Sequence, residues 1–447
     1  MRSIAVIGSG IAGLVTAHGL RRAGCAVTLW SDRTPDQWLA ARPTGTAARF
    51  APALAYEREL GLDHWHDQAP PIEGAHLLYC PRPGLRLVES IGRQSSPGLA
   101  IDVRLQSHRW MHELEARGGR VEIESVTVDR LDQIAAAHDL TIVATGGGGL
   151  DGIFERDPVR SVHHEPQRTV AMVVVTGPAL RRPQRPVVGV DFTILEGIGE
   201  TAWIPYFHRD AGPCWNLIFE AKAGGPMDVF GSARSGAEAL AAARRTIEAL
   251  LPWDAAWARD MALADAQGWL VGRITPTVRS PVGRLPSGRV VTCVGDTAVR
   301  FDPLAAQGAN NCTKMAKHLV ARVVARGEQP LDAAWMTQTF DDFWAELGHP
   351  AYALTNLLLA PMTRPGRLVL LAQAFCDGTG QGSRQALADA FAEGFAEPRR
   401  LVEAFCDGSK ARRLVTETTG RWWPRAVAAG AMGVARSGLR RALGRPG

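Results

Sequence analysis

The sequence is short of paired cysteines, of lysine and of long apolar runs. Its seven cysteines are scattered and none forms a Cys-x-x-Cys pair, so we expect neither a disulfide framework nor a metal site. No apolar run reaches the roughly 18 residues that a membrane span requires. An apolar strand begins at the N-terminus itself, so we expect no signal peptide and a cytoplasmic protein. The net charge of +5 over 447 residues is too small to indicate nucleic-acid binding.

What the chain does have is a glycine motif directly after its first apolar strand. Gly8-x-Gly10-x-x-Gly13 is followed by a helical run and then by a second apolar strand. Gly8 permits a tight turn, Gly10 lets the backbone approach a pyrophosphate, and Gly13 lets the helix pack closely on the strand. The N-terminus of the helix then faces the phosphates. The stretch predicts a dinucleotide-binding βαβ unit.

The residues after the second strand offer further contacts to a dinucleotide. In such folds an acidic residue about 20 positions beyond the glycines binds the ribose hydroxyls. Ser31 stands at that position and Asp32 follows it. We expect Asp32, or more weakly Ser31, to hold the adenosine ribose; the alternative is a solvated strand end. Arg42 is either a partner of the pyrophosphate or an ordinary surface arginine.

A second glycine stretch indicates which dinucleotide is bound. An apolar strand over 289–294 ends in Gly295-Asp296, which would place a carboxylate beside a sugar-like polyol. Gly308 stands at the start of a helix whose N-terminal N–H groups would face an anion or a carbonyl-rich ring. A cofactor that combines a pyrophosphate, a polyol and an electron-accepting ring is FAD.

The region between these stretches predicts a different architecture. Residues 167–221 carry strand-like segments with few helical patterns between them, which indicates a second, antiparallel sheet. Its large aromatic side chains either line an apolar pocket or belong to the hydrophobic core.

We therefore expect an α/β protein with a Rossmann-like FAD-binding domain, an inserted antiparallel-sheet substrate domain and a C-terminal helical region. The expected parts are 1–66, 96–160 and 276–330 for the FAD-binding domain, 67–95 and 161–275 for the substrate domain, 331–415 for the C-terminal helices, and 416–447 for a basic extension. This extension would be a basic helix, or would lie on a membrane surface or an acidic partner.

Motifs spread over residues 1–415 carry a resemblance to a known family. They are Gly8-Ser-Gly-Ile-Ala-Gly13, Val27-Thr-Leu-Trp-Ser-Asp-Arg-Thr-Pro-Asp36, Asp102-Val-Arg-Leu105, Pro166-Gln-Arg168, Gly295-Asp296 and Asp302-Pro-Leu-Ala-Ala-Gln-Gly-Ala-Asn310. In this combination the chain resembles the oxygenase component of the styrene/indole monooxygenases, FAD-dependent enzymes of the glutathione-reductase-type fold. Ala306 stands where that family usually has glycine. The segment from Gly45 to Phe50 keeps the family's threonine but differs on either side of it.

The resemblance implies a two-component enzyme. A separate NAD(P)H:flavin reductase would supply reduced FAD, which with O2 forms a C4a-hydroperoxyflavin that epoxidises or hydroxylates a small apolar aromatic or indole-like substrate. By the same resemblance Asp296 would hold the ribityl chain, and Pro303 to Asn310 would line the isoalloxazine. Backbone N–H groups at Gly308 to Asn310 would stabilise negative charge on the ring. Thr46 would lie beside the ring.

The expected site residues fall into three groups. The catalytic residues are Thr46, Pro303 and Gln307. The cofactor-binding residues are Gly8, Gly10, Ile11, Ala12, Gly13, Ser31, Asp32, Arg33, Arg42, Thr46, Arg104, Val126, Thr145, Gly146, Gly295, Asp296, Pro303, Gly308, Ala309 and Asn310. The substrate-pocket residues are Arg49, Phe50, Trp203, Tyr206, Phe207 and Trp215. The identity of the substrate, the position that is oxidised and the oligomeric state, including a homodimer, stay open.

The sequence also differs from those of flavoproteins with other activities. A single-component hydroxylase that uses NAD(P)H directly carries Gly-Ala-Asp-Gly after the strand that ends at Ala144, where this chain has Thr145-Gly146. A flavin halogenase needs a lysine soon after the first βαβ unit, and the first lysine here is Lys222. An oxidase or desaturase and a non-catalytic flavin-binding protein stay open as alternatives.

Overall fold

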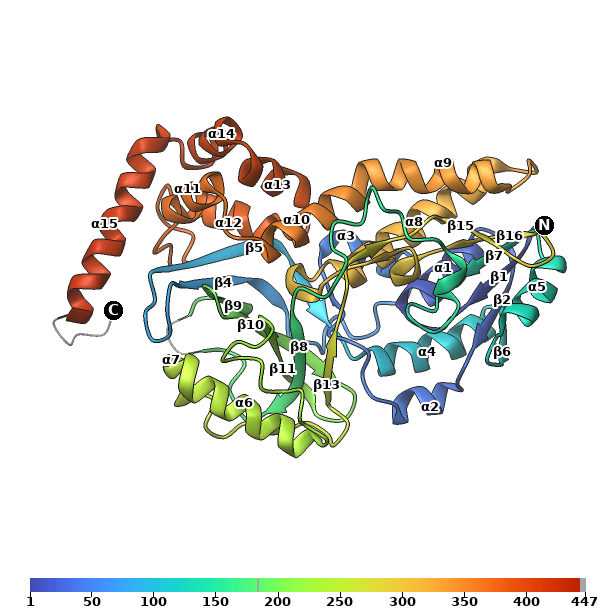
Figure 1. The fold of residues 1–447 in the computed structure, drawn as a ribbon, viewed down its shortest axis with the longest axis horizontal. Helices are drawn as coiled ribbons and strands as arrows, with labels where there is room; N and C mark the ends of the chain where they lie inside the picture. Colours follow the sequence, from blue (N-terminus) through green and yellow to red (C-terminus); the bar gives the residue numbers. More distant parts are fainter. Residues whose placement is uncertain (183–184, 443–447) are drawn as a thin grey trace. The chain divides into compact units, whose positions relative to one another are not determined.

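The structure, a computed structural model, describes residues 1–182 and 185–442, which divide into two units (Figure 1). Unit 1 comprises Met1–Asp67, Ile101–Pro166 and Ile274–Tyr352. Unit 2 comprises Gln68–Ala100, Gln167–Arg273 and the chain from Ala353 onward. Of the expected basic extension, residues 443–447 lie outside the described residues. No helix in the described ranges is long and apolar enough to cross a membrane.

Unit 1 is built on a largely parallel sheet with the strand order β15-β16-β7-β1-β2-β6. Neighbouring strands run parallel except for the antiparallel pair β15 and β16. The strands are β1 (Ser3–Ile7), β2 (Ala26–Ser31), β6 (Arg120–Ile123), β7 (Leu140–Val143), β15 (Val282–Arg284) and β16 (Val290–Cys293). The central strands β1 and β7 are apolar and almost wholly buried, as strands of a parallel sheet covered on both faces must be.

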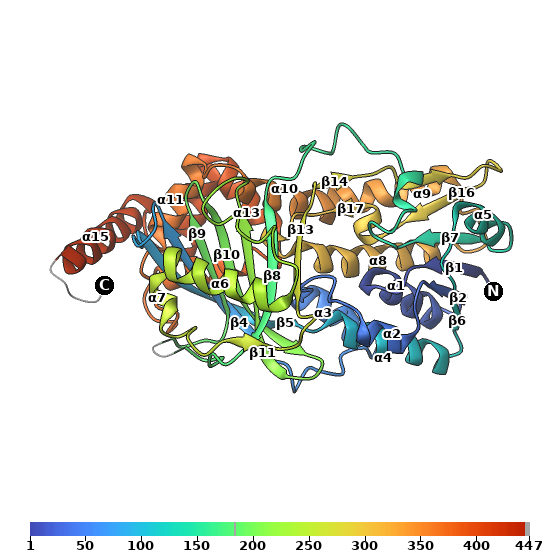
Figure 2. The same ribbon diagram turned by 60° about the horizontal axis from the view of Figure 1, so that its bottom comes forward.

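The remaining elements of unit 1 are helices and short strands around this sheet. They are α1 (Ile11–Arg22), α2 (Pro35–Ala40), β3 (Ala48–Arg49), α3 (Ala51–Glu59), α4 (Val103–Ala116), α5 (Val128–Ala136), β14 (Thr277–Val278), β17 (Val299–Arg300), α8 (Gln307–Arg326) and α9 (Ala333–Phe343). Helices α1 and α8 pack against each other (Figure 2). Unit 1 continues to Tyr352, beyond residue 330, because α9 packs on α8 and on β16. The division at Tyr352 falls inside α10 (His349–Leu359).

Unit 2 contains the large, mostly antiparallel sheet. Its strands follow the order β12-β8-β11-β10-β9-β4-β5, and β13 also pairs with β8. Only the pair β4 and β9 runs parallel within this order. The strands are β4 (Ile72–Cys80), β5 (Val88–Ala100), β8 (Thr169–Thr176), β9 (Val190–Leu195), β10 (Gly199–His208), β11 (Gly212–Ala221), β12 (Ala262–Leu263) and β13 (Trp269–Arg273).

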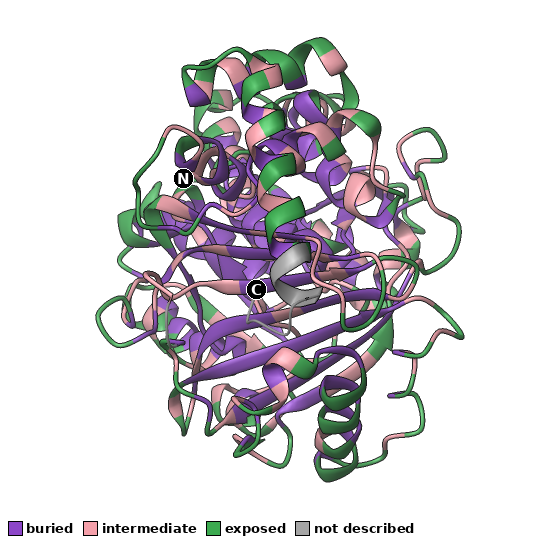
Figure 3. Cartoon of the chain, turned by 90° about the vertical axis from the view of Figure 1, so that its left-hand side faces the viewer, coloured by how far each residue is buried: buried purple, intermediate pink, exposed green. Residues whose placement is uncertain are grey.

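Helices cover this sheet on both faces, so that its strands are buried over most of their length (Figure 3). On one face α6 (Gly236–Leu250) begins at Ser235, whose hydroxyl accepts a hydrogen bond from the N–H of Glu238, and turns an alanine-rich side to the strands. The short α7 (Pro252–Ala255) follows it. The other face has the C-terminal helices, of which α12 packs on β5. They are α11 (Arg364–Ala372), α12 (Gln385–Glu393), α13 (Pro398–Cys406), α14 (Gly408–Thr419) and α15 (Trp423–Ala442).

Candidate functional site

The turn from β1 into α1 has the geometry that the first glycine motif predicts. A Cβ on Gly13 would lie 1.8 Å from the carbonyl oxygen of Gly8, so only glycine allows α1 to pack this closely. Gly10 caps α1, and a Cβ added there would meet no atom within 4 Å. The first turn of α1 holds Ile11 and Ala12 but no acidic residue, and no side chain of the described residues caps its N–H groups. These N–H groups and the positive end of the helix dipole therefore fit an anion such as a pyrophosphate.

The end of β2, where a ribose-binding acid is usual, is built differently. The hydroxyl of Ser31 is buried, lies 2.6 Å from the hydroxyl of Ser9 and donates to the carbonyl of Arg33 at 2.6 Å. The indole N–H of Trp38 donates to the same Ser9 hydroxyl at 2.9 Å. Asp32 has a side chain that is 55% exposed, and its carboxylate pairs with Arg33 at 2.8 Å. Ser31 is therefore already held by protein groups and Asp32 lies at the surface; a ribose contact by either stays a prediction.

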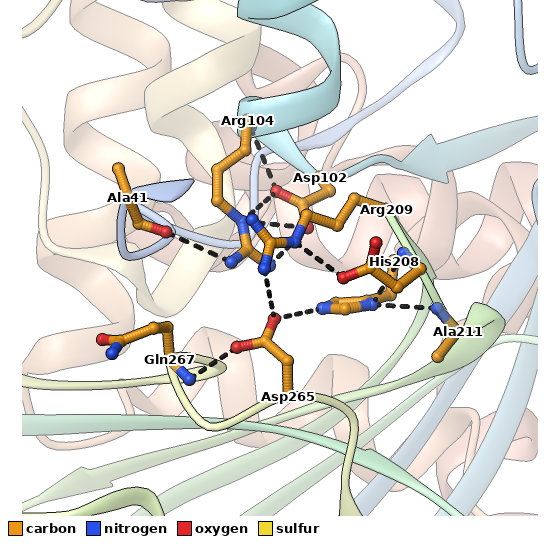
Figure 4. Close-up of polar contacts among 9 residues, drawn as sticks. Ala41, Asp102, Arg104, His208, Arg209, Ala211, Asp265 and Gln267 are labelled. Carbon is orange, nitrogen blue, oxygen red and sulfur yellow. Dashed lines mark hydrogen bonds and ion pairs between the residues drawn. The ribbon is translucent and has the colours of Figure 1, made fainter. Parts of the chain in front are cut away.

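Arg104 supports the loop that carries Arg42. Its guanidinium is buried, donates to both oxygens of Asp102 at 2.9 and 2.7 Å, and donates to the carbonyl of Ala41 at 3.2 Å (Figure 4). The same carboxylate caps α4 by accepting from the N–H of Arg104 at 3.0 Å. Arg104 thus positions the backbone next to Arg42, which is exposed, and a direct contact of either arginine with a cofactor stays a prediction.

The second glycine stretch meets the first at the same edge of the sheet. Strands β1, β7 and β16 run parallel, so the residues that follow each of them lie together. Gly295 has a φ of +64°, and a Cβ there would stand 2.5 Å from the Cβ of Ala12. After β7, the N–H of Gly146 donates to the hydroxyl of Thr297 at 2.9 Å. The hydroxyl of the preceding Thr145 is buried and has no hydrogen-bond partner among the described residues.

Asp296 lies between the two helix N-termini with its side chain open to solvent at this edge. Desolvation by the surrounding protein raises the pKa of Asp296, although Arg300 and a hydrogen bond from the Cys312 thiol act in the opposite direction. A Cβ on Gly308, in the first turn of α8, would lie 4.0 Å from the Asp296 carboxylate. An exposed carboxylate acceptor beside a helix N-terminus fits the hydroxyls of a ribityl chain.

The chain turns sharply just before α8. The carboxylate of Asp302 accepts from the N–H of Leu304 at 3.1 Å and opens a single helical turn over Pro303–Ala305. Ala306 then adopts the left-handed conformation, with φ 52° and ψ 31°. The side-chain amide of Gln307 donates to the carbonyl of Ala305 at 2.8 Å. Within the part of the chain that the structure describes, no side chain caps α8, and its first turn has no acid. The N–H groups near Gly308 and Ala309 therefore fit a ring that carries negative charge.

The left-handed Ala306 supports a stability prediction. An L-residue in this conformation costs roughly 1–2 kcal/mol relative to glycine, although glycine loses more backbone entropy on folding. We expect Ala306→Gly to raise the free energy of unfolding by about 1 kcal/mol. Urea denaturation measures it. The control is Ala305→Gly, at a buried position of ordinary conformation, which should destabilise; the same sign for both variants would contradict the strain argument.

Asn310 ties the segment after Thr46 to the start of α8. Its side-chain nitrogen donates to the carbonyls of Ala306 and Ala48, at 2.8 and 3.0 Å, and its oxygen accepts from the N–H of Phe50 at 2.8 Å. The side chain is fully buried. The sequence predicts a role only for the backbone of Asn310. No local signal indicates this side-chain role, because the partners Ala48 and Phe50 lie 262 and 260 residues away.

Arg49 is expected at the substrate pocket, but its guanidinium contacts Glu57 and Ala47 within unit 1. Its guanidinium is fully buried, lies 2.6 Å from the carboxylate of Glu57 on α3, and donates to the carbonyl of Ala47 at 2.7 Å. Ala47 is itself left-handed, with φ 51°. The ion pair therefore supports the strained backbone next to Thr46. Burial raises the pKa of Glu57 to about 7, against the opposing effect of Arg49.

This shift gives a pH dependence with a definite sign. Because the pKa of Glu57 is raised from 4.5 to about 7, its contribution to stability is present below pH 4.5 and is lost as the pH rises through about 7. We expect Glu57→Gln to remove this slope from the free energy of unfolding, measured by denaturation between about pH 5 and 8. The exposed Glu59→Gln on the same helix is the control and should keep the wild-type slope. Equal slopes for wild type and Glu57→Gln would contradict the assignment.

The aromatics expected at the substrate pocket do not all lie on one face of the unit 2 sheet. Trp203 and Trp215 face α6 and pack edge-to-face with each other and with Trp257. Tyr206 is three residues from Trp203 on β10 and therefore points to the opposite face of the sheet. Phe207 is half-buried near the end of the same strand. The two tryptophans thus belong to the core beneath α6.

The other expected residues lie in loops or at the ends of helices. Thr46 and Pro303 are half-buried in the loops before β3 and α8, and Phe50 is buried as the cap of α3. Val126 is half-buried in the loop between β6 and α5.

Unit 2 also contains a group of possible metal ligands, in His208, Asp210 and Asp265, whose ligand atoms lie within 4.8 Å of one another. The Nδ1 of His208 accepts from the N–H groups of Asp210 and Ala211 at 3.1 Å each, which places the ring proton on Nε2, 2.6 Å from Asp265 (Figure 4). Both ring nitrogens are thus engaged by protein groups. We interpret the group as a hydrogen-bonded cluster.

Comparisons with known proteins identify similar chains. A family model named for the substrate-binding domain of styrene monooxygenase A matches residues 146–256, and a model of an NAD(P)-binding Rossmann-like domain matches residues 6–35. Styrene monooxygenase StyA of Pseudomonas fluorescens is 27% identical over 330 residues, which cover 72% of this chain and 78% of that protein. Styrene monooxygenase StyA of a Pseudomonas sp is equally similar, with 27% identity over 330 residues.

Solved structures show the same fold. A flavoprotein/dehydrogenase from Cytophaga hutchinsonii superposes with a TM-score of 0.63 at 12% identity, covering 94% of this chain and 98% of that one. The p-nitrophenol 4-monooxygenase PnpA from Pseudomonas putida DLL-E4 gives 0.57 at 15% identity, with 94% and 98% covered. The flavin-dependent brominase Bmp2 gives 0.58 at 13% identity, with 98% and 99% covered. At these identities the likeness shows the fold alone.

Taken together, the matches confirm several expectations. The resemblance to the styrene monooxygenase oxygenase component is confirmed. The α/β fold with a Rossmann-like domain and C-terminal helices is confirmed as well. So are the class of enzyme, an FAD-dependent oxidoreductase, and FAD with O2 as cofactor and co-substrate.

Proposed function

We propose that this chain is the oxygenase component of a two-component monooxygenase. It would take reduced FAD from a separate NAD(P)H:flavin reductase and, with O2, epoxidise or hydroxylate a small apolar aromatic or indole-like molecule. The observation that carries the proposal is the similarity to styrene monooxygenase over 72% of the chain, in a protein whose glycine stretches meet at one sheet edge.

The residues of unit 1 would share the work of holding the cofactor. The N-terminus of α1 at Gly10 would bind the pyrophosphate, and Asp296 would accept hydrogen bonds from the ribityl chain. The N–H groups of Gly308 to Asn310 would face the ring and stabilise negative charge there. When bound, FAD supplies the oxygen-activating chemistry, and the protein supplies binding, orientation and exclusion of water.

Two features support FAD as a diffusible co-substrate. Ser31 stands in place of the usual ribose-binding acid. Its hydroxyl already forms hydrogen bonds with the hydroxyl of Ser9 and the carbonyl of Arg33. Fewer contacts to the adenosine ribose favour release of the cofactor between turnovers. In addition, Thr145-Gly146 replaces the Gly-Ala-Asp-Gly segment of hydroxylases that use NAD(P)H directly.

A single-turnover experiment tests the proposal. The protein is mixed with photochemically reduced FAD, styrene or indole, and isotopically labelled O2, with no nicotinamide and no reductase. We expect an oxygenated product that contains one labelled oxygen atom, and none when NADPH and oxidised FAD replace reduced FAD. A dehydrogenated product without label would identify an oxidase or desaturase. Product formed from NADPH alone would identify a single-component hydroxylase. Either result would overturn the proposal.

A further inference from the structure

The last helix of unit 2, α15, has two faces of different chemistry. On its inner face Ala426, Gly430 and Ser437 are buried. A Cβ on Gly430 would stand 1.8 Å from the carbonyl oxygen of Leu371 in α11, so the two helices pack with their backbones in close approach (Figure 1). The inner face therefore holds α15 against the rest of unit 2.

The outer face is exposed, and its side chains are apolar or cationic. Ala428, Met432 and Ala435 are exposed along its middle, and Met432 is 54% exposed. At 100° per residue, Arg425 and Arg436 lie along one edge of the same face. Among the described residues neither arginine makes an ion pair or a side-chain hydrogen bond. The sequence from residue 421 to the end contains six arginines and no aspartate or glutamate.

A tryptophan stands at the beginning of this surface. Trp422 immediately precedes α15 and is 66% exposed. A solvent-facing helix usually presents charged residues of both signs, which form pairs at spacings of three and four. Here, in contrast, two arginines without an ion pair among the described residues and an exposed methionine share the outer face, and an exposed tryptophan precedes it in the chain. We call Trp422 and the outer face of α15 the terminal surface.

The chemistry of the terminal surface matches the interface of an anionic bilayer. Arginine binds phosphate groups, and tryptophan prefers the headgroup level, where its apolar body is buried and its N–H remains hydrated. Helices that lie in this interface combine basic side chains on one part of their surface with apolar ones on another. An acidic protein would satisfy the arginines but gives no reason for the exposed Trp422 and Met432.

We propose that the terminal surface binds anionic lipid membranes peripherally, with Arg425 and Arg436 at the phosphates and Trp422 and Met432 at the headgroup boundary. The helix would lie on the bilayer and would not cross it. This binding is independent of the flavin reaction and is measured without it.

Flotation of the full-length protein with lipid vesicles tests this proposal. We expect binding to phosphatidylcholine vesicles that contain phosphatidylglycerol, and little binding to phosphatidylcholine alone, at about 0.1 M salt. Arg425→Glu combined with Arg436→Glu should lower the partition coefficient roughly tenfold or more. Trp422→Ala should lower it several-fold, also at higher salt, because its contribution is apolar.

A matched double variant controls for net charge. Arg245→Glu with Arg259→Glu makes the same change at two exposed positions of unit 2 and should bind vesicles as the wild type does. All substituted residues are exposed, so the melting temperatures should stay at the wild-type value. The proposal is overturned if the wild type does not float with anionic vesicles, or if both double variants lose binding equally. Retention on immobilised polyglutamate without vesicle binding would also overturn it, in favour of an acidic protein partner.

Discussion

Gly10→Ala should lower the affinity for FAD roughly tenfold or more while the apoprotein stays folded. Gly10 has an extended backbone that any residue adopts, with φ −78° and ψ −177°, and a Cβ there would meet no protein atom within 4 Å. The added methyl group leaves the packing unchanged but stands where a pyrophosphate would approach the N–H groups of α1. Titration with FAD, followed by quenching of flavin fluorescence, measures the affinity, and thermal unfolding of the apoprotein measures the fold.

Two further glycines separate loss of binding from loss of fold. Gly13→Ala should destabilise the apoprotein itself, because its Cβ would lie 1.8 Å from the carbonyl oxygen of Gly8. Gly152→Ala, in the same unit and with no atom within 4 Å of its Cβ, should change neither quantity. If Gly10→Ala binds FAD as tightly as the wild type, the pyrophosphate does not lie at this turn.

Asn310→Ala is expected to cost about 2–4 kcal/mol of stability. The substitution removes three buried hydrogen bonds and leaves the N–H of Phe50 and the carbonyl of Ala48 without this partner. The segment beside Thr46 would then be held less firmly against α8. Urea denaturation measures the loss, and proteolysis of the folded protein near residue 47 reports the local loosening.

The neighbouring Asn311 provides the matched control. It is buried to a similar degree, at 2% exposure, but its side-chain nitrogen has no hydrogen-bond partner among the described residues. Asn311→Ala should therefore cost clearly less than Asn310→Ala. Equal losses would mean that burial of the amide, rather than the three hydrogen bonds, sets the effect.

The parts of the site that could be predicted from sequence are those with local causes. The turn at Gly8 and the close packing at Gly13 depend on neighbouring residues, and so does the strand that ends before Gly295. Residue type and short spacing are enough to recognise such features. The opposite orientations of Trp203 and Tyr206 also follow from the period of two along a strand. The sequence alone therefore places these two side chains on opposite faces of the sheet.

The remaining parts depend on residues that are distant along the chain or on which face is covered. Nothing near Asn310 indicates that its amide reaches Ala48, and a glutamate such as Glu57 on a short helix is usually a solvent-facing residue. Likewise, alternation places Trp203 and Trp215 on one face of the sheet but does not say that α6 covers that face.

The sequence by itself determined the two glycine turns, the order of the elements around them and the chemistry of the cofactor that they fit. These follow from backbone conformations and hydrophobic periods that act over a few residues. Only the tertiary structure decided that the side chain of Asn310 joins two segments, that Arg49 is paired with Glu57, and that α15 leaves a cationic face exposed. Each of these depends on which side chains the folded chain brings within a few ångströms, and long-range packing sets those distances.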